Sequence, residues 1–190
     1  RILAGQIIHL MIERLEKIPP NERKDTLVLA LDSRDLFFQA GGADITRAFF
    51  NNPNVKQGSR LLYSGEENCW PMSWAPFSHL LGYIVSSDKP KISFRDLHTC
   101  KNLFPPQPED PSKSITAYVN SGGMIGYADT MYDVHRAMKA FPDWFINNYP
   151  QGHQTYHAQA YLSRQFPVAV DSCSRIFRSV QFYTDETEEV

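Results

Sequence analysis

Residues 27–35 read LVLALDSRD, and this stretch gives the clearest indication of the fold. Its five apolar residues, 27–31, are bounded by charged residues, a pattern typical of a central strand that is covered on both faces. Asp32 and Asp35 follow the strand and would bring two hard oxygen ligands to the carboxyl edge of a sheet, where divalent cations and phosphates bind. The alternative is that a strand-end Asp caps the next turn.

Predicted helices alternate with predicted strands outward from this stretch. Residues 5–17 carry apolar side chains on one broad helical face, and this helix ends before Pro19. A short helix near 43–50 separates the first strand, 26–31, from a second buried strand at 60–64. A helix between two strands at this spacing predicts a right-handed crossover and a mostly parallel central sheet.

The second half of the chain begins with a change in composition. Residues 71–111 are rich in Pro, Ser, Asp and Lys, which predicts a long irregular insertion. Order returns with a strand at 115–119 and a glycine-containing loop after it. The remaining predicted elements are helices at 130–141 and 154–165 and a short strand at 168–171. The 190 residues are therefore predicted to form a single α/β domain.

Composition excludes some classes of partner. The net charge is −2 and no basic cluster is present, so we expect no nucleic-acid binding. No apolar stretch is long enough for a membrane span, and no leader is visible. The chain starts at Arg1 without Met, so we expect it to be part of a longer protein. Cys69, Cys100 and Cys173 lack metal-site spacing, which leaves one bridge with a spare thiol, or three thiols, open.

Polar motifs follow two of the predicted strands. Residues 120–123, NSGG, would let backbone N–H groups approach an anion or a sugar hydroxyl, with a tight turn as the alternative. Glu66 and Trp70 follow the second strand, and an acid beside an indole is a combination that binds sugars. Core packing is the more common use of a Trp.

Two histidines have the spacing of neighbours on a helix. His153 and His157 are four residues apart and would share a face, as metal ligands do. No Glu follows His153 as an H-E-x-x-H site needs, so a structural role is the more common explanation. Ser64 and Ser121 have no triad partners in a recognisable order, which argues against a hydrolase.

Four motifs in order resemble the glycosyltransferase domain of procollagen lysyl hydroxylases and its stand-alone relatives, over nearly the whole chain. They are LDSRD at 31–35, YSGE with CWP within 63–71, VNSGGMIGYA at 119–128, and Asp171 with SRIF at 174–177. The resemblance implies a GT-A-like, Rossmann-type nucleotide-sugar fold. It also implies an enzyme that uses a UDP-sugar and Mn²⁺ to transfer a hexose to a hydroxyl acceptor, hydroxylysine-linked sugar in the animal relatives.

The resemblance assigns roles residue by residue. Asp32 and Asp35 match the metal-binding D-x-x-D, where the cation bridges the diphosphate and offsets charge on the leaving UDP. Glu66 and Trp70 match the acid and the indole of the acceptor and sugar side, and we predict Glu66 as the first catalytic candidate. The substrate-binding residues implied beside the donor are Asn120, Ser121, Gly122, Gln154 and, near uracil, Arg34.

The chain departs from the family pattern at three places. Arg34 replaces a Tyr that stacks on uracil, a role that a flat guanidinium can also fill. Gly152 and His153 replace an Asp-Asp pair, and we predict His153 as a second catalytic candidate because imidazole titrates near neutral pH. The opening uridine strand and a late metal-binding His have no counterpart within residues 1–190, so we expect a fragment that lacks both, with loss of these elements as the alternative.

Three classes of function follow from these motifs. The first is a Mn²⁺-dependent glycosyltransferase with a UDP-sugar donor and a protein or glycan acceptor, which by resemblance works in the secretory pathway. The second is a non-catalytic relative that binds a nucleotide-sugar or glycan, favoured by the missing Asp-Asp pair. The third is a structural module that keeps the fold without a working pocket.

Overall fold

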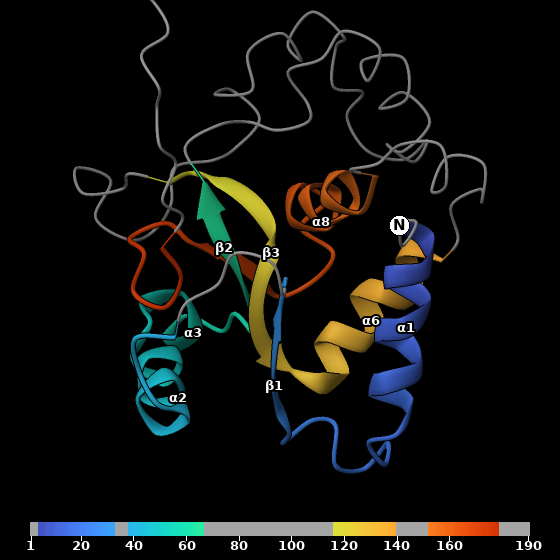
Figure 1. The fold of residues 1–190 in the computed structure, drawn as a ribbon, viewed down its shortest axis with the longest axis horizontal. Helices are drawn as coiled ribbons and strands as arrows, with labels where there is room; N and C mark the ends of the chain where they lie inside the picture. The colour runs from blue at the N-terminus through green and yellow to red at the C-terminus, as the bar shows by residue number, and fades with distance from the viewer. Residues whose placement is uncertain (1–3, 33–37, 67–115, 140–151, 179–190) are drawn as a thin grey trace, which may run out of the picture.

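The structure is a computed structural model that describes residues 4–32, 38–66, 116–139 and 152–178. Nine helices and strands lie in these ranges, and Figure 1 shows their arrangement. In chain order they are α1 Ala4–Glu16, β1 Leu27–Leu31, α2 Gly42–Asn51, α3 Pro53–Lys56, β2 Leu61–Glu66, β3 Tyr118–Tyr127, α6 Ala128–Met138, α8 Gly152–Leu162 and β4 Val168–Asp171.

Most predicted elements within these ranges are confirmed with ends that differ by a few residues, but the strand expected at 115–119 shares only residues 118 and 119 with β3. The helix expected at 5–17 is α1, which buries Ile8, Ile12 and Leu15 at helical spacing. The strand expected at 168–171 is β4 with the same bounds. The expected insertion at 71–111 lies outside the described residues.

The prediction of a mostly parallel sheet is wrong. The four described strands have the order β1-β3-β2-β4, and β3 pairs antiparallel with both β1 and β2. Only β2 and β4 pair in parallel. The reason is that β3 runs between β1 and β2, which are parallel to each other but are not neighbours. β1 is therefore an edge strand of the described sheet rather than a central one.

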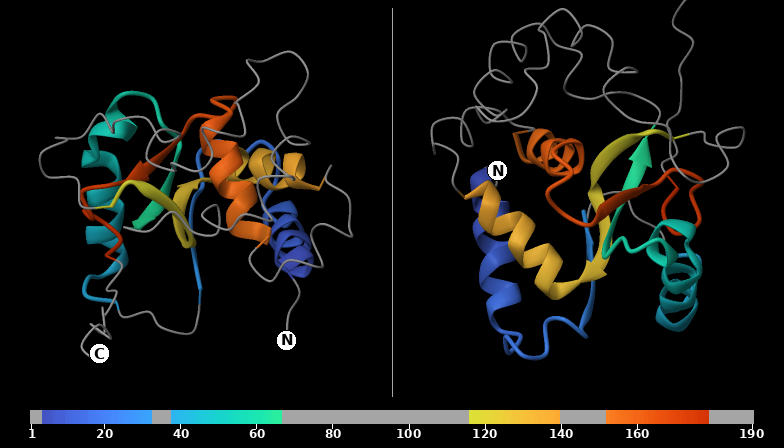
Figure 2. Two further views of the ribbon diagram at one scale, coloured as in Figure 1. Left: turned by 90° about the horizontal axis from the view of Figure 1, so that it is seen from above. Right: turned by 180° about the vertical axis from the view of Figure 1, so that it is seen from behind.

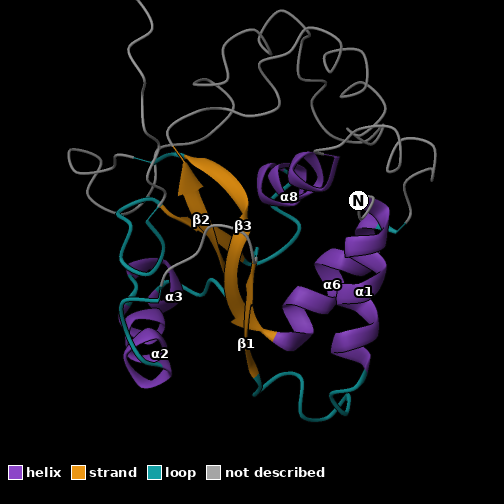
Figure 3. Ribbon diagram, viewed as in Figure 1, coloured by secondary structure: helices purple, strands orange, loops and turns teal. Residues whose placement is uncertain are grey.

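Helices cover both faces of this sheet (Figures 1 and 2). On one face, α1, α6 and α8 enclose the larger core, which includes Leu61, Tyr63 and Val170 from the strands. On the other face, α2 and the segment after β4 contribute Phe49 and Phe177 to a smaller core. The strands alternate their side chains between the two cores, as a pleated sheet requires. The result is a three-layer α/β arrangement, as the colouring by secondary structure makes clear (Figure 3).

The glycine-containing stretch expected as a loop is part of β3. Ser64 pairs with Asn120 and Tyr63 pairs with Met124, so residues 121–123 have no pairing partner on β2. Gly123 instead pairs with Leu31 of β1. This irregularity is a bulge, which glycine permits and which turns side chains away from the regular ladder. At Gly123 a Cβ would lie 2.9 Å from the Phe177 ring, so glycine is required for close packing there.

Candidate active site

The candidate site lies at one edge of the sheet. Because β1 and β2 run in the same direction and β3 runs against them, the carboxyl ends of β1 and β2 meet the amino end of β3. Asp32, Glu66 and Asn120 come from these three ends. The edge expected from the sequence therefore exists, although the sheet that forms it is mixed.

Glu66 is the centre of a hydrogen-bond network at this edge. Its side chain is buried, and Oε2 accepts a hydrogen bond of 3.1 Å from Nδ2 of Asn120. Its other oxygen, Oε1, accepts a hydrogen bond from Nε2 of Gln154 on α8. The Oε1 of Gln154 in turn accepts a 3.4 Å bond from Oγ of Ser121. The network connects β2, β3 and α8, three elements that are distant in the sequence.

The electrostatic environment of Glu66 favours its neutral form. Burial raises its pKa to about 7, against smaller lowering effects of the bonds from Asn120 and Gln154. Among the described residues, its hydrogen-bond donors are neutral amides, which do not supply the opposite charge that would hold the pKa low. A carboxyl group that titrates near neutral pH can both accept and release a proton under ordinary conditions.

Asp32 is tied to this network through the bulge of β3. Its backbone N–H donates a 2.7 Å hydrogen bond to the carbonyl oxygen of Gly122. The N–H of Gly122 donates a 2.7 Å bond to Oδ1 of Asn120, whose amide nitrogen bonds to Glu66. A Cβ built on Gly122 would lie 3.7 Å from the Cβ of Asp32. Asp32 and Glu66 are therefore connected through two residues of one strand.

Three histidines on two helices interact with one another: His135 on α6, and His153 and His157 on α8. The rings of His135 and His157 have centroids 5.1 Å apart, and Nδ1 of His157 lies 3.1 Å from the hydroxyl of Tyr63. Burial lowers the pKa of both histidines, and their mutual repulsion lowers that of His157 further. Both are buried, so they are held as neutral imidazoles inside the larger core.

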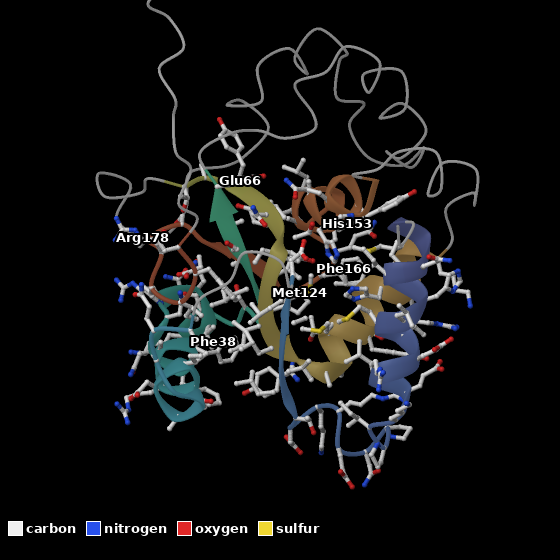
Figure 4. All side chains as sticks on the ribbon, viewed as in Figure 1. Phe38, Glu66, Met124, His153, Phe166 and Arg178 are labelled. Atoms are coloured by element: carbon white, nitrogen blue, oxygen red, sulfur yellow. The ribbon has the colours of Figure 1, made fainter. Side chains whose placement is uncertain are left out.

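His153 is the member of this group that directly precedes Gln154 of the network. Figure 4 labels His153 at α8 and Glu66 at the end of β2. Burial lowers the pKa of His153, and the nearby charge of Asp32 opposes this effect. The predicted i, i+4 pair of His153 and His157 lies on α8 as expected. Within the described ranges, however, no three His, Cys, Asp or Glu side chains are grouped to hold a metal.

Asp171 is a buried acid whose role the sequence did not reveal. Its Oδ1 accepts hydrogen bonds from Nδ2 of Asn52 at 3.2 Å and from the backbone N–H of Arg175 at 3.1 Å. Its Oδ2 accepts from the backbone N–H groups of Ile176 at 2.7 Å and Phe177 at 3.0 Å. The carboxylate thus fixes the segment after β4 against the sheet. The signal in the sequence was an acid at the end of a short apolar strand.

Several predicted residues have no described position. Arg34, Asp35 and Trp70 lie outside the described residues, as do Cys69 and Cys100, so their predicted roles are not tested by the geometry. Of the predicted residues that are described, Asp32, Glu66, Asn120, Ser121, Gly122 and Gln154 are connected by the contacts above, and His153 is adjacent to Gln154. No helix within the described ranges has the length and apolar character needed to cross a membrane.

The fold and the site together define an α/β protein with a buried acid and polar strand ends at one sheet edge. Multifunctional procollagen lysine hydroxylase and glycosyltransferase LH3 of Homo sapiens is similar, with 25% identity over 187 residues that cover 96% of this chain. The Multifunctional procollagen lysine hydroxylase and glycosyltransferase of Caenorhabditis elegans is 24% identical over 190 residues, 97% of the chain. No family model matches the chain.

These similarities support a relation to the procollagen lysine hydroxylase and glycosyltransferase family. The chain spans about a fifth of the length of these relatives, 19% of the human protein and 20% of the nematode one. Both relatives are described as having hydroxylase and glycosyltransferase activities. The similarity therefore supports a glycosyltransferase-like relationship.

Proposed function

We propose that this chain is a metal-dependent glycosyltransferase of GT-A-like fold that transfers a hexose from a UDP-sugar to a hydroxyl group. The observation that carries the proposal is the contact path from Asp32 through Gly122 and Asn120 to Glu66. This path connects Asp32, whose carboxylate is proposed to bind a cation, with Glu66, whose carboxylate is proposed to accept a proton. Both acids lie at the same edge of the sheet. The similarity to hydroxylase-glycosyltransferases supports the same class.

Glu66 is the group that we assign to proton transfer. As the acceptor oxygen bonds to the anomeric carbon and the bond to UDP breaks, the acceptor hydroxyl must lose its proton, and the Glu66 carboxylate takes it. A pKa of about 7 makes this carboxylate basic enough for the task while a substantial fraction stays ionised at neutral pH. Asn120 and Gln154 orient its two oxygens.

Asp32, together with Asp35, is the group that we assign to Mn²⁺. Carboxylate oxygens are ligands that suit this ion. When bound, Mn²⁺ acts as a Lewis acid that offsets negative charge on the UDP leaving group. The hydrogen bond from the Asp32 backbone to Gly122 fixes the start of this segment beside Asn120. Ser121 and Gly122 are proposed to contact the donor sugar, with Arg34 against uracil and Trp70 on the acceptor side.

The remaining parts of the proposal follow from the resemblance. The acceptor is a protein or a glycan, and the animal relatives suggest hydroxylysine-linked sugar. The secretory pathway is the proposed location, where proteins of this kind meet collagen-like acceptors.

The test is UDP release from a UDP-hexose in the presence of Mn²⁺ by the wild type and by Asp32→Ala. We expect the variant to lose turnover and wild-type turnover to require the cation. Asp25→Ala is the matched control, because Asp25 is exposed just before the opposite end of the same strand. Unchanged turnover in Asp32→Ala would overturn the proposed role of Asp32 in binding the metal.

A second candidate function is a relative that binds the nucleotide-sugar without turning it over. It is favoured by one feature, Gly152 and His153 in place of the Asp-Asp pair of the family. Calorimetry would then detect UDP binding that needs Mn²⁺, with no release of UDP from any hexose donor. The same pair of variants applies, because Asp32→Ala would weaken that binding and Asp25→Ala would not.

A further inference from the structure

A side-chain hydrogen bond that the proposed function does not use also joins β2 to α8. The hydroxyl of Tyr63 lies 3.1 Å from Nδ1 of His157. Three residues further along β2, Glu66 accepts its hydrogen bond from Gln154, which lies three residues before His157 on α8. Residues three apart share a face of a helix, so Gln154 and His157 are both on the face of α8 that meets β2.

The bond between Tyr63 and His157 lies inside the larger core. Both side chains are buried. Burial raises the pKa of Tyr63 and lowers that of His157, so neither group is charged at neutral pH. A buried polar group that loses its partner costs about 1–3 kcal/mol, and here each group completes the other. A displacement of α8 along β2 would therefore leave a buried hydroxyl and a buried imidazole unsatisfied.

Ring contacts on two sides hold the imidazole of His157 in place. The ring of Tyr63 lies edge-on to it, with centroids 5.2 Å apart. The ring of His135 on α6 lies edge-on as well, with centroids 5.1 Å apart. The ring of His135 is itself fixed, because its Nδ1 lies 2.6 Å from the carbonyl oxygen of Met131, one turn earlier on α6. The position of His157 is therefore set by β2 and α6 together.

The apolar contacts of α8 do not determine its position as closely. The helix contributes two tyrosines and two alanines to the larger core, Tyr156, Ala158, Ala160 and Tyr161. Burial of such side chains stabilises the helix on the sheet, but the hydrophobic effect is non-directional. A hydrogen bond has a narrow range of distance and angle, so the polar contacts select which residue of α8 meets Glu66.

We infer that Tyr63 and His157 are positioning residues: their hydrogen bond sets where α8 lies on β2, so that Gln154 meets Glu66. The inference rests on the proposed function, which assigns proton transfer to Glu66, but the contacts that carry it do not depend on the reaction. Gln154 transmits the position of the helix to two strands, because Nε2 donates to Glu66 and Oε1 accepts from Ser121.

The titration of Glu66 reports whether Gln154 is in place. Burial raises the pKa of Glu66 to about 7, and the bond from Gln154 lowers it against that effect. If α8 moves, the ionised carboxylate loses a donor and its pKa should rise further. The neighbouring histidines should titrate at lower pH, because burial lowers the pKa of His135 and His157.

The experiment compares the titration midpoint of Glu66 in the wild type and in Tyr63→Phe, which keeps the ring and removes the hydroxyl. NMR of the side-chain carboxyl carbons gives the midpoint, and the signal is assigned by its absence in Glu66→Gln. We expect the midpoint to rise by about 0.5 to 1 pH unit. Tyr132→Phe is the matched control, because it removes a hydroxyl that donates a bond of the same length, 3.1 Å, to Glu16 on α1. Its midpoint should equal that of the wild type.

Further variants test whether the effect passes through α8. His157→Asn keeps a polar atom close to the position of Nδ1, so its midpoint should stay nearer to that of the wild type than the midpoint of His157→Leu. In Gln154→Leu the donor to Glu66 is already absent. Adding Tyr63→Phe to that variant should therefore move the midpoint no further, which is the non-additivity expected of residues that act through one another.

The outcomes separate this inference from the proposed function. An unchanged midpoint in Tyr63→Phe overturns the inference, as does a shift of the same size with and without Gln154. The expected shifts in a protein that releases no UDP from any hexose donor would support the positioning role and overturn the proposed function. A thermal unfolding curve of Tyr63→Phe that matches that of Tyr132→Phe excludes a folding defect as the cause of the shift.

Discussion

Two buried carboxylates lie on neighbouring parallel strands, and their surroundings differ in kind. Asp171, at the end of β4, is fully buried and accepts hydrogen bonds from three backbone N–H groups and from Asn52. Glu66, at the end of β2, accepts from the side-chain amides of Asn120 and Gln154. Both acids end a strand, yet only the bonds at Asp171 come from the backbone of the next segment.

This difference indicates a structural role for Asp171, which fixes the segment after β4, and a chemical role for Glu66. Backbone N–H groups directed at one carboxylate stabilise its ionised form and fix a loop. Two neutral amides do not compensate the burial of Glu66, so its pKa is raised to about 7. An acid that is costly to ionise and lies in a polar network is a candidate for function, whereas Asp171 has the contacts of a structural clamp.

The largest expected effect is on catalysis, in Glu66→Gln. Loss of the proton acceptor should reduce sugar transfer by about 10²- to 10⁴-fold. In the wild type the rate should rise as the pH passes about 7, because the carboxylate must be ionised to act as a base. Initial rates of UDP release from pH 5.5 to 9 test this, and the rise near pH 7 should vanish in Glu66→Gln.

Stability provides an independent measurement for the same variant. Because folding raises the pKa of Glu66, its stabilising contribution is complete below about pH 4.5 and is lost as the pH rises through about 7. Glu66→Gln cannot ionise, so it should gain stability relative to the wild type over that range in urea unfolding. Glu13→Gln on the exposed face of α1 is the control and should change neither profile. A wild-type rate that does not change with pH would contradict the role of Glu66.

The next effect is on folding, in Asp171→Ala. The substitution leaves the N–H groups of Arg175, Ile176 and Phe177 without their acceptor inside the protein. We expect a loss of about 3 kcal/mol or more in the free energy of unfolding, measured by urea titration. Asp133→Ala, at an exposed position of α6, should cost less than about 0.5 kcal/mol. Equal stability of the two variants would mean that Asp171 is not a clamp.

Apart from most of β3, the elements of the fold could be predicted from the sequence, but their pairing could not. The apolar runs at 27–31 and 168–171 indicated strands because period and length are local properties. Strand direction is set by long-range pairing, and β3 follows β2 only after residues 67–115. The glycines of β3 were interpreted as a loop because glycine is common in turns, whereas here they permit a bulge and the close approach of Phe177.

The candidate site could also be predicted only in part, because some of its residues follow local patterns and others are brought together by long-range contacts. Asp32 and Glu66 were found because acids directly after an apolar run, or two residues beyond one, are visible locally. The contacts of Asp171 with Asn52 and of His157 with Tyr63 join residues that are 119 and 94 positions apart, and no local pattern encodes them. The raised pKa of Glu66 is likewise a property of burial, which only the packed structure supplies.

The smallest expected effect comes from Gly122→Ala, which changes the surroundings of Glu66 and leaves Glu66 itself unaltered. In Gly122→Ala the new Cβ would lie 2.9 Å from Oδ1 of Asn120, the end of a flexible side chain that can move away. Asn120 would then lose its bond from the Gly122 N–H and its place beside Glu66. We expect a cost of about 1 kcal/mol in stability, with transfer reduced by about tenfold.

The pH profile distinguishes this displacement from a general loss of folding. The bond from Asn120 lowers the pKa of Glu66, so losing it should move the midpoint of the rate profile of Gly122→Ala to higher pH. The control is Gly42→Ala, where a Cβ meets nothing within 4 Å at the start of α2. Its midpoint should equal that of the wild type, with a stability that is unchanged or slightly higher because alanine favours helix. An unchanged midpoint in Gly122→Ala would mean that the hydrogen bond from Asn120 does not tune the pKa of Glu66.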